Sequence, residues 1–394
     1  MASQRPQRIG VITTSYPMSD ADPAGGFVAA HTSLLRAAGN TVEIVAAASS
    51  QPAGALAAPA ATHRIGSAAV FAHGGAPDAL ETAVVSHPWL QSGLFSLRMA
   101  AVVARRRHHW DAVVAHWLAP SALAALTTRG PLLAIAHGGD VHLLHRLHLL
   151  TPTVAALAAR RARLVFVNRT AAALVKDAVP VRLARYLDQA ATVIPMGVAV
   201  DNFATVAQRR LARPTPSVPR VVVIARHVTV KGIDVMLAAL PWLPIAIELQ
   251  LVGNGPLTGK LQHLAANLRA QHPRHTIEFV GALAPAQRDE ALAQADLVVV
   301  PSRQLANGRT EGMPQVALEA LASGIPLVAT ATGGLADLPP PVVLCAPDSP
   351  QALANAIIHT LAAPPAAIDC MAVAAEFSWP RVYQRLRDHW FAGP

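Results

Sequence analysis

The sequence predicts an α/β protein made of two Rossmann-like domains with parallel sheets, and three observations lead to this prediction. The chain has 394 residues, more than one ordinary α/β core needs and enough for two. Short β-branched runs alternate with helical stretches, a rhythm typical of parallel βαβ layers. Residues 212–219 carry three prolines and end just before a new strand, so we place the linker there, near Pro214.

The first domain, residues 1–212, is expected to contain six strands. They are predicted at 8–13, 42–47, 112–116, 132–136, 164–167 and 192–194. A helix over 27–38 follows the first loop and ends at Gly39–Asn40, a favourable C-cap pair. The Ala- and Pro-rich stretch 51–61 is predicted to be a loop.

The second domain, residues 213–376, repeats the pattern. Its strands are predicted at 220–225, 247–252, 277–280, 297–300, 327–330 and 342–344. The tail 377–394 is a third segment, in which 377–390 has the pattern of a separate amphipathic helix.

Composition excludes several classes of protein. Hydrophobic residues make up 53% and charged residues 14%, which disfavours disorder. No apolar run reaches the roughly 18–20 uncharged residues of a membrane span, and the polar residues 1–8 predict no secretory signal. The two cysteines, Cys345 and Cys370, lack metal-ligand spacing. These features favour a cytoplasmic protein.

The net charge of +9 can indicate nucleic acid, an anionic membrane or phosphate-bearing substrates as partners. The arginine clusters at 105–107 and 160–163 are short and contain no interleaved aromatic residues, so nucleic acid is not expected. Two interpretations remain. The arginines cover solvated helix faces, or the first half docks peripherally on the anionic inner face of a membrane.

Basic residues and glycines follow two strands of the second domain. Arg226 and Lys231 come directly after the strand at 220–225, and strand ends are where open parallel sheets bind ligands. Arginine supplies a fork and lysine a point charge, which together suit a diphosphate. Gly253, Asn254 and Gly255 follow the next strand, and the two glycines would let the backbone approach a ligand closely.

The segment from Glu311 to Glu319 is the most informative part of the sequence. A strand ends at residue 300, and Pro314 stands where a helix would start. The two glutamates are about 12 Å apart if the segment is fully helical, too far for a glycosidase pair sharing one bond. They can instead contact the two ends of one elongated ligand, with sugar hydroxyls at Glu311 and ribose hydroxyls at Glu319. Free N–H groups near Gly312 and Met313 would face its anionic part.

This segment resembles the E-x7-E signature of the family 4 retaining glycosyltransferases, also called group 1 glycosyltransferases. Arg226 and Lys231 fall where that family has its diphosphate-binding pair, and Gly253 and the Val280–Gly281 pair also fit. The resemblance implies the GT-B fold, in which two Rossmann-like domains face each other. It also implies that the tail helix crosses back onto the first domain.

The resemblance extends to the first domain. His137–Asp140 spells H-G-G-D and is similar to the family's H-G-x-D/E loop, which implies that His137 lies beside the donor sugar. Gly25 and Gly26 match the family's first glycine-rich loop, which approaches the donor phosphates. His116, at another strand end, and Asp140 are predicted to contact the acceptor.

The implied reaction moves a sugar from a nucleoside diphosphate to an acceptor with retained anomeric configuration and without a metal ion or other cofactor. His137, Arg226, Lys231 and Glu311 are the predicted catalytic residues. The acceptor is left open among a glycan, a lipid-linked molecule and a small molecule. Alternatives are a nucleotide-sugar 2-epimerase and a non-catalytic sugar- or lipid-binding relative. A nicotinamide dehydrogenase is disfavoured because the third glycine and the ribose-binding acid of its fingerprint are missing.

Two further patterns are not expected to bind metal. His142, His145 and His148 recur every third residue and would spread around a helix rather than converge. Residues 20–22 spell the D-x-D of metal-dependent GT-A transferases but stand in the first loop, where we expect a solvated turn.

Overall fold

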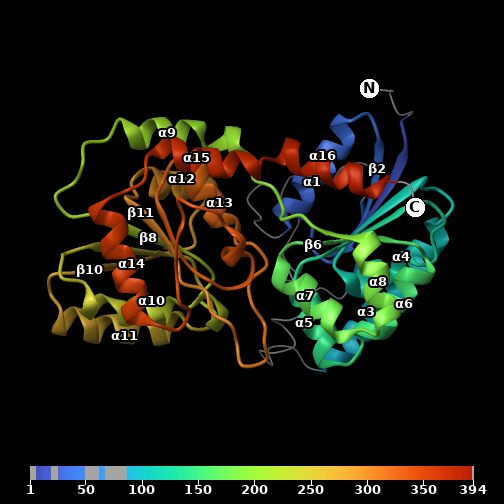
Figure 1. Cartoon of the computed structure of the whole chain (residues 1–394), viewed down its shortest axis with the longest axis horizontal. Coiled ribbons are helices and arrows are strands. Elements are labelled where there is room, and N and C mark those ends of the chain that lie inside the picture. The colour runs from blue at the N-terminus through green and yellow to red at the C-terminus, as the bar shows by residue number, and fades with distance from the viewer. Residues whose placement is uncertain (1–5, 19–24, 49–61, 67–86, 393–394) are drawn as a thin grey trace. The chain divides into compact units, whose positions relative to one another are not determined.

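A computed structural model of the chain describes residues 6–18, 25–48, 62–66 and 87–392 (Figure 1). These residues fold into two compact units. The first unit comprises residues 1–196 together with 380–394, and the second comprises residues 197–379. The predictions for residues 51–61 and 20–22 concern segments outside the described residues.

The first unit is built on a seven-stranded parallel sheet with the order β3-β2-β1-β4-β5-β6-β7. Its strands are β1 (Arg8–Ile12), β2 (Thr41–Ala47), β3 (Thr62–Ile65), β4 (Ala112–His116), β5 (Leu132–Ala136), β6 (Arg163–Phe166) and β7 (Ala191–Val193). Its helices are α1 (Gly26–Ala37), α3 (Pro88–Arg106), α4 (Leu123–Ala125), α5 (Gly139–Arg146), α6 (Leu150–Ala159), α7 (Arg169–Ala178), α8 (Val181–Ala190) and α16 (Trp379–Trp390), with the short segment η2 (Leu118–Ala122) after β4.

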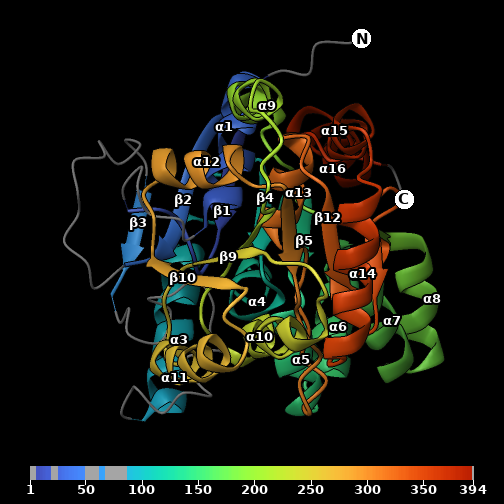
Figure 2. The same ribbon diagram turned by 90° about the vertical axis from the view of Figure 1, so that its left-hand side faces the viewer.

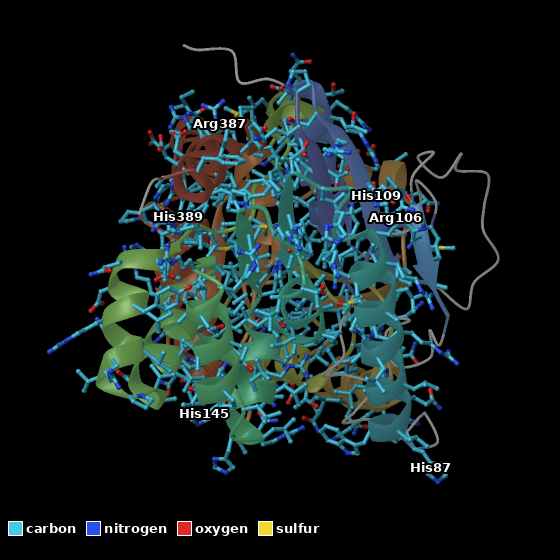
Figure 3. The ribbon with its side chains drawn as sticks, turned by 90° about the vertical axis from the view of Figure 1, so that its right-hand side faces the viewer. His87, Arg106, His109, His145, Arg387 and His389 are labelled. Atoms are coloured by element: carbon cyan, nitrogen blue, oxygen red, sulfur yellow. The ribbon has the colours of Figure 1, made fainter. Side chains whose placement is uncertain are left out.

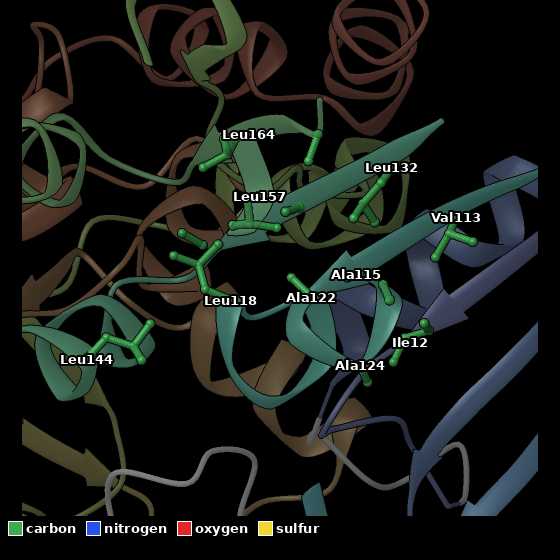
Figure 4. Close-up of a cluster of buried hydrophobic side chains, with 14 of the residues drawn as sticks. Ile12, Val113, Ala115, Leu118, Ala122, Ala124, Leu132, Leu144, Leu157 and Leu164 are labelled. Atoms are coloured by element: carbon green, nitrogen blue, oxygen red, sulfur yellow. The ribbon is translucent and has the colours of Figure 1, made fainter. Parts of the chain in front are cut away.

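Both faces of this sheet are covered by helices (Figure 1). The larger core lies under α3 to α8, where Leu118, Leu157 and Leu164 are almost fully buried among strand residues (Figure 4). Phe95 of α3 is buried in the same core. The opposite face is covered by α1 and α16. The strands are therefore buried on both sides, which explains why they read as continuous hydrophobic runs rather than alternating ones.

The second unit is built on a six-stranded parallel sheet with the order β10-β9-β8-β11-β12-β13. Its strands are β8 (Arg220–Ile224), β9 (Glu248–Val252), β10 (Thr276–Gly281), β11 (Leu297–Val300), β12 (Leu327–Thr330) and β13 (Val343–Cys345). Its helices are α9 (Ala204–Leu211), α10 (Ile233–Ala239), α11 (Thr258–Gln271), α12 (Pro285–Ala293), α13 (Gln315–Ala322), α14 (Pro350–Ala362) and α15 (Ala367–Glu376). Short 3-10 turns, η3 (Val200–Phe203), η4 (Thr229–Lys231), η5 (Leu240–Trp242) and η6 (Gly333–Asp337), connect them.

Two cores flank this second sheet. One packs under α12, α13 and α15, and the other under α10, α11 and α14 (Figure 2). Neighbouring residues of β8 alternate between them, since Val222 belongs to the first core and Val221 and Val223 to the second. This alternation is the period of two expected of a strand buried on both faces.

The strand order fixes where each unit can bind a ligand. In the first unit the order reverses between β1 and β4, and in the second between β8 and β11. Open parallel sheets bind ligands outside the carboxyl ends of the strands at such a switch point, because the loops diverge there. The loops after β1, β4, β8 and β11 are therefore the places to examine.

The boundary between the units differs from the expected one. We predicted it at residues 212 and 213, whereas the compact units divide at Met196 and Gly197. Val198, Phe203 and Val206 are buried in the core of the second unit, so η3 and α9 precede the proline-rich stretch yet belong to that unit. Burial of an apolar face, rather than proline content, decides which unit a segment joins.

The tail helix α16 belongs to the first unit. The His389 ring nitrogen Nε2 lies 3.0 Å from the carbonyl oxygen of Leu164 and 3.1 Å from that of Ala190 (Figure 3). Arg385 also donates to the carbonyl of Val193 at 3.1 Å. The chain therefore returns to the first unit after completing the second, as the resemblance implied.

Strand β3 was not predicted from the sequence. It has four residues, stands at the edge of the sheet and pairs with β2 from Ile44↔Thr62 to Ala47↔Ile65. A short edge strand carries too few apolar residues for a detectable pattern.

Within the described ranges no single helix has the length and hydropathy to cross a membrane; α14 and α15 meet that test only as a pair bent by 120°.

Candidate active site

The switch point of the second unit gathers the predicted cations. Arg226 lies two residues beyond the end of β8, and Lys231 closes the turn η4 that follows. Gly232, which directly follows this lysine, adopts a left-handed conformation with φ of 61° and is the N-cap of α10. The tight turn keeps Lys231 at the carboxyl end of the sheet, so its ammonium group reaches the loop that follows β11.

Lys231 and Glu311 form an ion pair. The lysine Nζ lies 2.8 Å from Glu311 Oε2, and the two side chains are 23% and 16% exposed. They are 80 residues apart in sequence, and the adjacency of β8 and β11 in the sheet brings them together. The prediction gave them separate partners, a diphosphate for Lys231 and sugar hydroxyls for Glu311. In the structure each is a partner of the other.

The glycine pair Gly333–Gly334 packs closely against the loop that carries Glu311. The amide of Gly334 lies 3.4 Å from the Glu311 carbonyl, and a Cβ atom on Gly334 would lie 1.9 Å from the Gly312 carbonyl oxygen. A side chain at this position would therefore collide with the loop backbone. Helix α13 starts only at Gln315, with Pro314 as its N-cap. The helical spacing assumed for Glu311–Glu319 is thus wrong for its first half, and Gly312 and Met313 precede the helix.

Glu319 lies on α13 and pairs with Arg288 on α12. The carboxylate Oε1 lies 3.4 Å from the arginine, and the side chains are 13% and 31% exposed. Burial raises the pKa of Glu319, and the nearby Arg288 opposes this effect. The structure therefore places a cation, Arg288, beside Glu319, the residue predicted to bind the ribose. Sequence reasoning did not identify this cation.

The loop after β9 approaches the loop after β8 closely. Gly253 has φ of 128°, and a Cβ atom there would lie 2.0 Å from the Ala225 carbonyl oxygen, so only glycine fits. The carbonyl of Asn254, an exposed residue, accepts the amide of His227 at 3.0 Å. His227 is itself buried, and its Nδ1 lies 2.8 Å from Thr258 Oγ1. These contacts join the loop after β8 to the loop after β9.

In the first unit, Gly25 and Gly26 begin α1. Gly25 is the left-handed N-cap with φ of 74°, and Gly26 is the first helical residue. A side chain on Gly25 would collide with the carbonyl of Ser15 in the loop after β1. The helix therefore starts against the carboxyl end of β1, as a ligand loop at this switch point requires.

His137 follows β5 and packs against two aromatic rings. Its ring centroid is 4.9 Å from that of Phe27 and 4.7 Å from that of Trp117. Burial lowers its pKa to about 3, and His31 contributes to the shift. The imidazole is thus neutral at neutral pH and can donate or accept hydrogen bonds, but it does not supply positive charge.

His116 and Asp140, which were predicted to contact the acceptor, are both buried in the structure. His116 is fully buried, and its two ring nitrogens lie 3.2 Å from His31 Nδ1 and 3.0 Å from His137 Nε2. Asp140 is buried as well, and its carboxylate accepts the backbone amides of Leu118 at 2.6 Å and His137 at 3.0 Å. Because internal hydrogen bonds occupy both side chains, they support the neighbouring loops rather than face an acceptor.

The predicted spread of the histidines near α5 is what the structure shows. His142 and His145 lie on α5, whereas His148 lies beyond its end, and His145 and His148 are exposed (Figure 3 labels His145). Across the described ranges, no group of three or more His, Cys, Asp or Glu side chains could hold a metal ion.

Sequence reasoning missed His31 and Arg288. His31 stands inside a helix that is otherwise ordinary, and Arg288 belongs to a polar stretch with no motif. Each contacts a predicted site residue from a different element, so no spacing along the chain could have revealed them. A helix-period count would have placed His31 on the buried face of α1 beside Val28 and Leu35.

Comparison with known proteins agrees with this geometry. Residues 218–363, which contain Arg226, Lys231, Glu311 and Glu319, match the family model described as glycosyl transferases group 1. This segment is a group 1 glycosyltransferase domain. It coincides with most of the second unit, so the family match covers the sheet whose switch point carries the Lys231–Glu311 pair.

Curated relatives resemble the same part of the chain. The Bacillus subtilis protein TuaC, a glycosyltransferase named for teichuronic acid biosynthesis, is 33% identical over 173 residues, 42% of this chain and 40% of that protein. A GDP-mannose-dependent alpha-(1-6)-phosphatidylinositol monomannoside mannosyltransferase of Mycolicibacterium smegmatis is 35% identical over 150 residues, 36% of this chain and 38% of that protein. The matched part of the chain thus spans about two fifths of the length of these relatives.

Solved structures extend the likeness to the whole chain. Anabaena Alr3699/HepE in complex with UDP and glucose has a TM-score of 0.65 and 18% identity, with 97% of this chain and 98% of that chain covered. Sucrose-phosphate synthase from Thermosynechococcus elongatus has a TM-score of 0.69 and 20% identity over the same shares. Around the group 1 domain, the chain therefore has the GT-B fold of two Rossmann-like units.

Proposed function

We propose that this protein is a metal-independent retaining glycosyltransferase that moves a sugar from a nucleoside diphosphate to an acceptor. The observation that carries the proposal is the Lys231–Glu311 pair at the switch point of a group 1 domain, 2.8 Å apart and largely shielded from water. The relatives support it, since one is named as GDP-mannose-dependent and one structure contains UDP and glucose.

In this proposal the donor replaces the internal ion pair with two ligand contacts. Lys231 turns from Glu311 to the diphosphate, where Arg226 adds a second cation. Glu311 then accepts hydrogen bonds from sugar hydroxyls, and Glu319 accepts them from the ribose after leaving Arg288. Cations fixed beside the leaving group stabilise the negative charge that develops there, which is the role a metal ion has in other transferases.

The chemical step follows from this arrangement. The bond between the anomeric carbon and the diphosphate oxygen breaks, and its electron pair stays on the diphosphate. The acceptor oxygen forms the new bond on the same face of the sugar, and its proton passes to the departing diphosphate. Retention results because attack and departure share one face. The enzyme contributes mainly positioning and leaving-group electrostatics.

The test compares two lysine variants with a panel of nucleotide-sugar donors, scoring nucleoside diphosphate release with and without acceptors. We expect Lys231→Ala to lower turnover by at least about 100-fold, as loss of one preorganised transition-state contact does. Lys176→Ala is the matched control, because that lysine also pairs with a carboxylate, Asp188, at 2.6 Å but on an exposed surface. Wild-type turnover in folded Lys231→Ala would overturn the proposal, and acceptor-independent release would favour the epimerase alternative.

We further propose that the protein associates peripherally with an anionic membrane through α3. The first half of this helix exposes large apolar side chains: Trp89 at 51%, Leu90 at 72%, Leu94 at 45% and Leu97 at 70%. Arg98 and Arg105 continue the exposed surface toward the helix end. Apolar residues that insert between acyl chains, next to arginines that meet phosphate groups, are typical of interfacial helices. A lipid-linked acceptor would suit such a location.

Vesicle co-sedimentation tests this association. We expect binding to anionic vesicles, weaker binding to zwitterionic ones, and loss of both in a Leu90→Ser/Leu94→Ser/Leu97→Ser variant. Leu211→Ser is the control, since that leucine is 59% exposed on α9 in the other unit. Equal sedimentation of the triple variant and the wild type would contradict the role of α3.

A further inference from the structure

Three histidines form a continuous hydrogen-bonded chain in the first unit. His31 Nδ1 lies 3.2 Å from His116 Nε2, and His116 Nδ1 lies 3.0 Å from His137 Nε2. They come from α1, from the last residue of β4 and from the residue after β5. We call these three hydrogen-bonded residues the histidine chain. It connects the interior of the unit to the loop that carries His137.

The surroundings hold the histidine chain in place. The planes of the His116 and His137 rings are within 19° of parallel, and the ring centroids are 5.3 Å apart. Asp140 fixes the backbone of His137, and the ring of Tyr383 on α16 stands edge-on to His31 with centroids 6.2 Å apart. The exposure of His31 is 2% and that of His116 is 0%. Because no ring can turn without losing several contacts, the order of the nitrogens along the chain is fixed.

Burial also keeps the histidine chain uncharged, since it lowers the pKa of His31 to about 4 and that of His116 well below its usual value. A neutral imidazole carries one proton on one of its two nitrogens. If His31 Nδ1 donates, His116 must accept at Nε2 and donate at Nδ1, and His137 must accept at Nε2 and carry its proton on Nδ1. In the opposite arrangement every proton is on Nε2. All three rings thus share one tautomer.

We propose that His31 and His116 are positioning residues that fix the ring orientation and the tautomer of His137. For its catalytic consequence the proposal rests on the proposed function and on the family resemblance, which implies that His137 lies beside the donor sugar. Neither His31 nor His116 contacts the substrate. They determine whether the outward nitrogen of His137 donates a hydrogen bond to a sugar oxygen or accepts one from a sugar hydroxyl.

Nitrogen-15 NMR of the histidine-labelled full chain tests the coupling without a donor. We expect one tautomer shared by His31, His116 and His137 in the wild type. In His31→Leu, where the first hydrogen bond is lost, we expect His137 to become a mixture of tautomers. His31→Asn keeps a polar group at the position of Nδ1 and should restore a single tautomer. Different tautomers among the three rings of the wild type would overturn the proposal with no variant needed.

Steady-state kinetics then tests the consequence for turnover. We expect His31→Leu to lower kcat roughly 10-fold with little change in the KM for the donor, as loss of an orienting partner does, and His31→Asn to recover most of that loss. His389→Leu is the control, because His389 is a partly buried histidine of the same unit that contacts backbone carbonyls. Unchanged kcat and unchanged His137 tautomer in folded His31→Leu would refute the positioning role. A wild type without transferase activity would refute the proposed function alone, since the NMR result is independent of it.

Discussion

The ion pair of Lys231 and Glu311 should contribute measurably to the stability of the free protein. The perturbation is a double-mutant cycle made from Lys231→Met and Glu311→Gln. The chain offers a matched exposed pair, Lys176 and Asp188, whose side chains are 52% and 55% exposed against 23% and 16% for the site pair. Both pairs have a lysine and a carboxylate within 3 Å, so burial is the main difference between them.

The expected magnitude follows from charge, distance and burial. Two unit charges about 4 Å apart attract by about 4 kcal/mol at an effective dielectric constant of about 20. Partial removal from water offsets part of this attraction, because each group loses solvation. We therefore expect a coupling free energy of about 1–3 kcal/mol for Lys231 and Glu311, against about 0.2–1 kcal/mol for the exposed pair.

The assay is urea unfolding of the wild type, the two single variants and the double variant of each pair, at low and at high salt. Coupling at the exposed pair should disappear at high salt, whereas that at the site pair should persist because it is partly shielded. A coupling at Lys231 and Glu311 no larger than that of the exposed pair would refute the reasoning. We also expect a bound donor to stabilise the wild type against heat, and the same variants to lose this stabilisation.

Two further predictions concern backbone fit and pH. Gly334→Ala should lower turnover at least about 10-fold and destabilise the protein by about 1–3 kcal/mol, because its Cβ would lie 1.9 Å from the Gly312 carbonyl oxygen. Gly259→Ala is the control and should keep turnover, because a Cβ at that position on α11 meets nothing within 4 Å. Equal behaviour of the two variants would contradict the steric argument. The free energy of unfolding should also fall as the pH is lowered from about 6.5 to about 4, by about 1.4 kcal/mol per pH unit for each histidine involved. The histidines are His31, His116 and His137, which the fold keeps neutral and the unfolded chain protonates. Asp140, with its pKa raised to about 6, has the opposite effect on stability, but it is one carboxyl group against three histidines. Urea unfolding at several pH values measures the profile, and a stability that does not change with pH would contradict this account.

Local pattern was sufficient to predict much of the fold. All six strands of the second unit and six of the seven in the first were predicted to within one residue at each end, because buried parallel strands are continuous apolar runs between turn residues. The spacing of Arg226, Lys231, Glu311 and Glu319 indicated a donor site, since the loops that follow neighbouring strands meet at one edge of a sheet.

The partners of those residues depended on the tertiary structure. Nothing along the chain indicates that Lys231 would pair with Glu311, 80 residues away, or that Arg288 would reach Glu319. The unit boundary at Met196 and Gly197 also escaped prediction, because it depends on which core buries η3 and α9. Periodicity specifies elements one at a time, whereas contacts between elements arise only when they pack.

The histidines of the first unit show most clearly what the sequence determines and what only the tertiary structure decides. The sequence by itself placed His116 and His137 at strand ends, and the family resemblance implied that His137 lies beside the donor sugar. Only the tertiary structure brought His31 from α1 into hydrogen-bond distance of His116 and so joined three elements in one chain. A hydrogen bond needs two groups within about 3 Å, and that distance is set by the packing of α1 on the sheet rather than by any spacing in the sequence.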